Sequence, residues 1–175
     1  MADLTFNTTS GATIDRELLI AYLNTSATST PTWSPLGKRV TDSSIDVDWS
    51  EETNRDILGS TYTTLKKPTM TQTFEPNDLD GGDTAIVKLW NLAFKDQDYA
   101  GLANLDVLIV HFYAGTASTP FAERYSSCAI SPSSLGGEGG GHISMPISIT
   151  FGGTRTVGTA SKDSTTGAIT FSAAS

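Results

Sequence analysis

The most regular hydrophobic pattern in the chain is a strict alternation that begins at Ile45. Ile45, Val47 and Trp49 fall on one face of an extended strand. Asp46 and Asp48 fall on the other face, so the pattern predicts a half-buried strand with an acidic outer face. The alternation favours a core position for Trp49, but a tryptophan at the start of a loop also suits an anchor at a protein interface.

A charged stretch follows this strand. Residues 50–56 read Ser-Glu-Glu-Thr-Asn-Arg-Asp, which is typical of a loop, and residues 57–65 return to strand-forming types. The pattern over residues 40–66 therefore predicts two strands joined by an extended hairpin or a long acidic loop.

One helix is predicted over residues 83–97. Asp83 is a suitable N-cap, because its side chain can accept hydrogen bonds from the first free backbone amides. The apolar residues that follow recur at helical spacing and form one stripe, which indicates a helix lying on a sheet. They are Ile86, Leu89, Trp90, Ala93 and Phe94.

The remaining apolar runs predict further strands. The most hydrophobic run, residues 105–113, is bounded by turn residues and is expected to be a central strand. The glycine-rich residues 131–141 are expected to form a flexible loop. The other predicted strands are residues 69–75, 121–130, 142–151, 155–159 and 168–171.

Composition supports a mainly β fold. The 175 residues include 26 threonines, 20 serines and 16 glycines, which favour short strands and turns over long helices. We expect β-sandwich or barrel-like sheets with one flanking helix, in a single domain over residues 1–175. Residues 1–32 and 160–175 are mostly small and polar and are expected to be flexible arms.

The net charge of −8 comes from two segments. Residues 42–56 hold six acidic residues and one basic residue, and residues 75–83 hold four acidic residues and no basic one. The sign is wrong for a surface that grips phosphates. Its confinement to two segments predicts one acidic surface on the folded protein.

No motif for catalysis, a metal or a cofactor stands out. The single Cys128 excludes an internal disulfide and a multi-cysteine zinc site. The glycines at 136–141 lack the Lys-Ser/Thr ending of a phosphate loop, and residues 76–87 lack both end ligands of a calcium loop. His111 and His142 lie in predicted strands, where packed or edge histidines are expected. We therefore expect a protein that is not an enzyme and has no cofactor.

The chain shows no apolar run of the length that crosses a membrane, and its first residues do not form a secretory signal. We expect no membrane partner and synthesis in a cytosol-like compartment.

The order of these elements resembles that of the major tail tube proteins of long-tailed, non-contractile bacteriophages. Four parts of the chain carry the resemblance: residues 33–48, residues 51–59, the strand at residues 67–76, and the helix near residues 83–97. The late strands over residues 143–159 fit the same pattern.

The resemblance implies a structural virion protein of the phage tail that is assembled in the cytoplasm of the host bacterium. Subunits of that family form hexameric rings, which stack by self-assembly into a hollow tube for genome delivery. The implied partners are other copies of the chain, a tape measure protein, and tail tip and terminator proteins. DNA would pass through the lumen without specific binding, and the inner tubes of contractile tails are close relatives.

Within that picture, Asp46 and Asp48 are candidates for an acidic lumen face that repels DNA, although they fit the outer wall equally well. The candidates for contact between subunits or rings are Trp49, Glu51, Glu52, Arg55 and Asp56. The main alternative function is a carbohydrate- or surface-binding β-sandwich module, such as a decoration or adhesion domain. A small hydrolase is a weaker third possibility.

Overall fold

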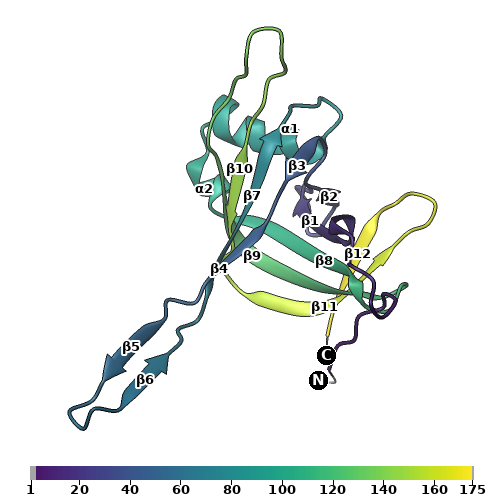
Figure 1. Cartoon of the computed structure of the whole chain (residues 1–175). Coiled ribbons are helices and arrows are strands. Elements are labelled where there is room, and N and C mark those ends of the chain that lie inside the picture. The colour runs from purple at the N-terminus through teal and green to yellow at the C-terminus, as the bar shows by residue number, and fades with distance from the viewer. Residues whose placement is uncertain (1–2, 175) are drawn as a thin grey trace.

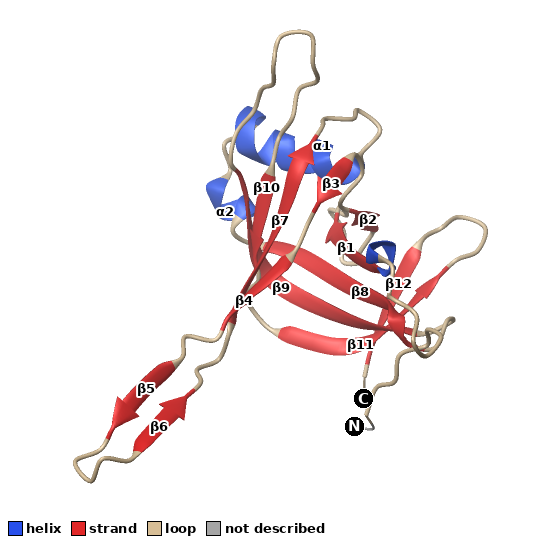
Figure 2. Ribbon diagram, viewed as in Figure 1, coloured by secondary structure: helices blue, strands red, loops and turns tan. Residues whose placement is uncertain are grey.

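The computed structural model describes residues 3–174 (Figure 1). The protein is mainly β, with its main helical segments gathered on one side of curled sheets (Figure 2). The predicted fold class is therefore confirmed.

Most of the predicted strands are present, although the strand predicted over residues 142–151 is confirmed only for Ile147–Thr150. The strands are β1 (Leu19–Asn24), β2 (Trp33–Pro35), β3 (Val40–Asp42), β4 (Ile45–Asp48), β5 (Glu52–Arg55), β6 (Thr61–Thr64), β7 (Thr69–Asn77), β8 (Leu105–Gly115), β9 (Pro120–Pro132), β10 (Ile147–Thr150), β11 (Arg155–Lys162) and β12 (Ile169–Ala173). The helical segments are η1 (Arg16–Leu18), α1 (Thr84–Trp90), η2 (Asn91–Lys95) and α2 (Tyr99–Leu102).

Ten of the strands form one antiparallel sheet in the order β2-β1-β8-β9-β10-β7-β3. β4 joins it beside β7, β11 pairs with β9, and β12 pairs with β11. Strand β9 is shared: its first part lies between β8 and β11, and its last residues pair with β10. The sheet is therefore two half-sheets connected through one strand.

A bulge bends β9 between its two parts. Leu105 lies opposite Cys128 and Val107 opposite Tyr125. Between these two pairs, β9 therefore contains one residue more than β8. Ser127 in the bulge has a positive φ of 61°, and its hydroxyl lies 2.7 Å from the side-chain oxygen of Asn104. Bulges of this kind bend and twist a strand, which turns one half-sheet relative to the other.

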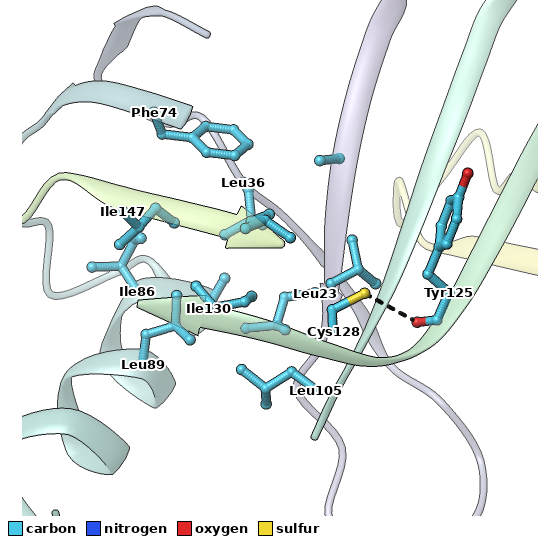
Figure 3. Packing of buried hydrophobic residues seen from close by; sticks show 14 of the residues in the cluster. Leu23, Leu36, Phe74, Ile86, Leu89, Leu105, Tyr125, Cys128, Ile130 and Ile147 are labelled. Carbon is cyan, nitrogen blue, oxygen red and sulfur yellow. Dashed lines mark hydrogen bonds between the residues drawn. The ribbon is translucent and has the colours of Figure 1, made fainter. Parts of the chain in front are cut away.

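The larger core fills the angle between the half-sheets and the helical layer. Ile86 and Leu89 of α1 point toward Ile130 and Ile147, and Leu23 and Leu105 complete the cluster from the other half-sheet (Figure 3). A second core covers the opposite face of β8. It contains Tyr22, Trp33, Leu108, Val110, Ala122, Ala160 and Ile169. Strand β8 is therefore buried on both faces, which explains its nearly continuous apolar sequence.

The predicted helix is confirmed but is not uniform. The Asp83 carboxylate accepts hydrogen bonds from the amides of Ala85 and Ile86, as an N-cap does. The helix then widens into the π-helical segment η2, which changes the phase of the side chains. As a result Leu92 packs against the core, whereas Phe94 from the predicted stripe is partly exposed.

The prediction of two strands over residues 40–66 is only partly right. β3 and β4 pair with β7 rather than with each other, and residues 50–56, expected as a loop, contain β5, which pairs with β6. Strands β5 and β6 form a separate two-stranded hairpin that extends away from the rest of the molecule (Figure 1). The glycine-rich loop after β9 protrudes at the opposite end (Figure 1).

The prediction of a flexible arm over residues 1–32 is wrong for β1. This strand pairs with β8 along its length and buries Ala21, Tyr22 and Leu23. The C-terminal residues 160–175 also include structure, because β12 pairs with β11 and Ile169 is buried in the second core. Both segments are short apolar runs in polar surroundings, and they form strands because non-local partners cover them.

We predict that Leu23→Ala lowers the free energy of unfolding by about 3 kcal/mol, because it removes a fully buried side chain from the larger core. The control is Leu4→Ala, whose side chain is 51% exposed and which should change stability by less than about 0.5 kcal/mol. Urea unfolding of both variants measures the difference. Equal, small effects would show that β1 is an arm after all.

Candidate assembly surfaces

The tip of the β5–β6 hairpin presents two aliphatic side chains to solvent. Ile57 is 102% exposed and Leu58 is 87% exposed. The turn is held by the Asp56 carboxylate, which accepts hydrogen bonds from the amides of Leu58 at 2.9 Å and Ser60 at 2.8 Å. Gly59 supplies the positive φ that this turn needs. The apolar tip is therefore preorganised and projects from the molecule.

The structure places all five predicted contact residues on or beside this hairpin. Trp49 lies at its base and is 48% exposed, so a core position for Trp49 is wrong. Glu52 pairs with Lys66 across the base at 3.3 Å, and Asp56 caps the tip. Glu51 is exposed, and the Arg55 guanidinium donates a hydrogen bond to the carbonyl of Gly59. Trp49 faces solvent because β4 is an outer strand that ends where the hairpin leaves the body.

Asp46 and Asp48 are exposed on β4, opposite Thr71 and Thr69 of β7. Residues directly opposite on antiparallel strands share a face. Next along the same edge, Asp42 lies opposite Glu75. Strands β3, β4, β7 and β10 contain no lysine or arginine, so this outer face carries carboxylates and hydroxyls only. We call it the acidic face.

In the second acidic segment, residues 75–83, Asp80 and Asp83 interact with other groups of the chain. The Asp80 carboxylate contacts Lys38 at 2.8 Å and Arg39 at 3.2 Å, and it accepts a hydrogen bond from the amide of Gly82. These interactions lower the pKa of Asp80 well below its ordinary value. Asp83 is occupied as the helix N-cap. This turn is therefore partly neutralised within the chain, unlike the acidic face.

A notch separates the two half-sheets at the base of the hairpin. It is an open groove of about 680 Å³, formed where β4 and β7 of one half-sheet diverge from β9 and β11 of the other. Its lining residues are Trp49, Lys67, Pro68, Thr69, Met70, Glu123, Tyr125, Phe151, Gly152, Gly153 and Arg155.

Glu123 anchors the wall of the notch. Its carboxylate contacts His111 at 3.0 Å, Tyr125 at 2.8 Å and Arg155 at 2.6 Å. Burial alone would raise the pKa of Glu123, but the hydrogen bonds from these three side chains outweigh it and lower the pKa to about 2. The network ties β8, β9 and β11 together. Sequence reasoning missed it because its members are far apart along the chain.

The ten-stranded sheet also has one unprotected outer strand. Among the strands of residues 3–174, β12 pairs only with β11, and its sequence Ile-Thr-Phe-Ser-Ala contains neither proline nor charge. The other outer strands carry Pro35 in β2 and aspartates in β3 and β4. Unpaired backbone groups on an uncharged outer strand are a template for another strand.

The groups considered for chemistry are poorly placed for it. Cys128 is buried, and burial raises the pKa of its thiol to about 11, so the reactive thiolate is scarce at neutral pH. Over residues 3–174, no three His, Cys, Asp or Glu side chains are grouped closely enough to hold a metal ion. No helix in that part of the chain has the length and apolar character needed to cross a membrane.

No protein-family model matches the chain, and no curated protein matches its sequence. Solved structures do match. The chain is similar to a chain of the sheath/tube terminator of an extracellular contractile injection system (PVC, extended state), with a TM-score of 0.54 and 10% identity over 85% of this chain and 99% of that one. The likeness is one of fold.

Two further structures have TM-scores of 0.49. The tube terminating cap of the anti-feeding prophage is 14% identical over 88% of this chain and 96% of its own. The sheath-tube complex of the same extracellular injection system contains a chain that is 10% identical over 86% of this chain and 94% of its own.

We predict that Glu123→Gln destabilises the protein by about 2 to 3 kcal/mol at pH 7. Because the pKa of Glu123 is lowered in the folded state, its stabilisation is complete above pH 4.5 and is lost as the pH falls toward 2. The stability gap between wild type and variant should therefore shrink over that range. Denaturant titrations at several pH values measure it, with the exposed Glu138→Gln as control. A gap that is constant with pH would contradict the network.

Proposed function

We propose that this chain is a structural subunit of a tail-like tube, which self-assembles into rings that stack around a hollow channel. The observation that carries the proposal is the preorganised hairpin with its exposed Ile57 and Leu58 on a fold shared with a tube terminator chain. Exposed aliphatic side chains on a rigid protrusion are expected where a partner covers them. The role is one of assembly rather than catalysis.

In the proposed ring, the free edge of β12 provides the lateral contacts between subunits, and the acidic face lines the channel. The free edge of β12 can accept a strand of a neighbouring copy, which extends the sheet from subunit to subunit. Six subunits per ring is the symmetry expected from the resemblance to tail tube proteins. The acidic face then serves as the channel wall, because carboxylates repel the phosphates of DNA whereas lysines would bind them.

The particle proposed here is a phage tail or a related injection device that is assembled in the host bacterium. The other partners in the proposal are a tape measure protein and the proteins of the tail tip and terminator. The sequence resembles the tail tube proteins of non-contractile phages, whereas the matched structure is a terminator chain of a contractile injection system.

A second function in the same class is a terminator ring that closes the end of a tube. The specific observation in its favour is that the matched terminator chain is covered over 99% of its length. A tube subunit continues to stack on itself, whereas a terminator stops after one ring. The two functions are therefore separated by whether assembly continues as the protein concentration rises.

The hairpin test removes residues 51–65 and joins the ends with a short Gly-Ser linker. The join is feasible because the amide of Lys66 already bonds the carbonyl of Trp49. We predict that the variant keeps the melting temperature of the body but no longer forms stacked assemblies in sedimentation velocity. The matched control shortens the glycine-rich loop over residues 137–140. Stacks of unchanged size from the hairpin deletion would count against the proposal.

The channel test replaces Asp46 and Asp48 with lysine. We predict that assembled particles of this variant bind duplex DNA, with a binding constant that falls steeply as salt rises, whereas wild-type particles do not. The charge-matched control is Asp96→Lys with Glu138→Lys, at exposed positions outside the acidic face. If both lysine pairs bind DNA equally, the acidic face does not line the channel.

A further inference from the structure

The notch at the hairpin base has the character of a receptor for an apolar segment. Trp49, Met70 and Phe151 form its apolar wall, and Trp49 remains half exposed. A partly exposed tryptophan beside other apolar side chains is the kind of residue that dominates protein interfaces. The wall is firmly positioned, because Tyr125 packs on Phe151 with ring centroids 4.9 Å apart and is hydrogen-bonded to Glu123.

The rim of the notch has one basic side chain in excess. Lys67 is exposed and forms no ion pair within residues 3–174, whereas Arg155 on the opposite side is paired with Glu123. The hairpin over residues 51–66 holds three acidic and two basic side chains, so its net charge is negative. Asp56 lies at the turn, directly before the tip. The charges of the hairpin and of the notch rim are therefore complementary.

A chain cannot fill its own notch with its own tip. Strands β5 and β6 are paired from Glu52–Thr64 to Arg55–Thr61, which keeps the hairpin extended. Figure 1 shows the hairpin running away from the body. The tip lies at one end of the hairpin and the notch at the other. Each copy therefore has one tip and one notch that can contact neighbouring copies.

A second groove competes for the tip. It lies between the helical layer and the end of β9, has a volume of about 400 Å³, and is lined by Phe94, Tyr99 and Leu102 among others. Asp96 and Asp98 lie in the same turn of chain, and Lys95 pairs with Asp96. The turn therefore keeps one net negative charge, which would repel an acidic hairpin. Charge therefore favours the notch.

We infer that Ile57 and Leu58 at the hairpin tip of one copy insert into the Trp49–Met70–Phe151 notch of another copy. The inference rests on the proposed self-assembly and names the contact that propagates it. Such a contact joins two different surfaces, so it repeats from copy to copy until it closes a ring or extends a stack.

Cysteine pairs test the contact directly. Leu58→Cys serves as the donor, and Met70→Cys, in the apolar wall of the notch, serves as the acceptor. Tyr99→Cys in the competing groove is the matched control acceptor. Donor and acceptor chains are mixed under mild oxidation and run on a non-reducing gel, with each single variant alone. Native Cys128 is buried, so its background is low.

The inference predicts a cross-linked dimer from the Leu58→Cys and Met70→Cys mixture and none from the Leu58→Cys and Tyr99→Cys mixture. It also predicts that Ile57→Asp with Leu58→Asp weakens association by roughly 100-fold or more, because two aliphatic side chains lose their burial. Ile57 is fully exposed and Leu58 is 87% exposed in the monomer, so its melting temperature should not change.

Two results would overturn the inference. If wild-type protein assembles but the cross-link forms through Tyr99→Cys, or through neither acceptor, then the tip does not bind the notch and the proposed function stands. If wild-type protein stays monomeric at every concentration, the proposed function fails and the inference fails with it.

Discussion

The bend of β9 is the constraint on which the rest of the structure depends. One strand pairs with β8 and β11 before the bulge at Ser127 and with β10 after it. The bulge sets the angle between the half-sheets. On one side the angle is filled by the larger core under α1, and on the other side it opens as the notch. A straight β9 would leave neither a filled core beneath the helices nor a receptor beside the hairpin.

The surfaces that matter for assembly are arranged around this frame. Glu123 ties the strands behind the notch, while the hairpin leaves from its opposite wall and exposes an apolar tip. The acidic face lies on the outside of β4 and β7 and keeps its carboxylates free of basic partners within its own strands. In the proposed assembly, apolar contacts occur at the tip and notch, and the carboxylates that would repel DNA lie on one sheet face.

Local patterns in the sequence predicted what depends on local geometry. The helix after Asp83 and the central strand β8 follow from periodicity and capping. What failed depended on distant partners. β1 belongs to the core because β8 covers it, 84 residues or more away, and Trp49 is exposed because β4 has no neighbour beyond it within residues 3–174. The Glu123 network required the register of β8, β9 and β11, which no local pattern contains.

The central claim is that this fold builds a hollow, repeating assembly from its own surfaces. The most direct measurement is electron cryo-microscopy of the concentrated wild-type protein. The account predicts closed rings with an open channel, stacked with one polarity, with the hairpin of each copy reaching a neighbour and the Asp46–Asp48 face toward the channel. Monomers at all concentrations, or compact oligomers without a channel, would contradict it.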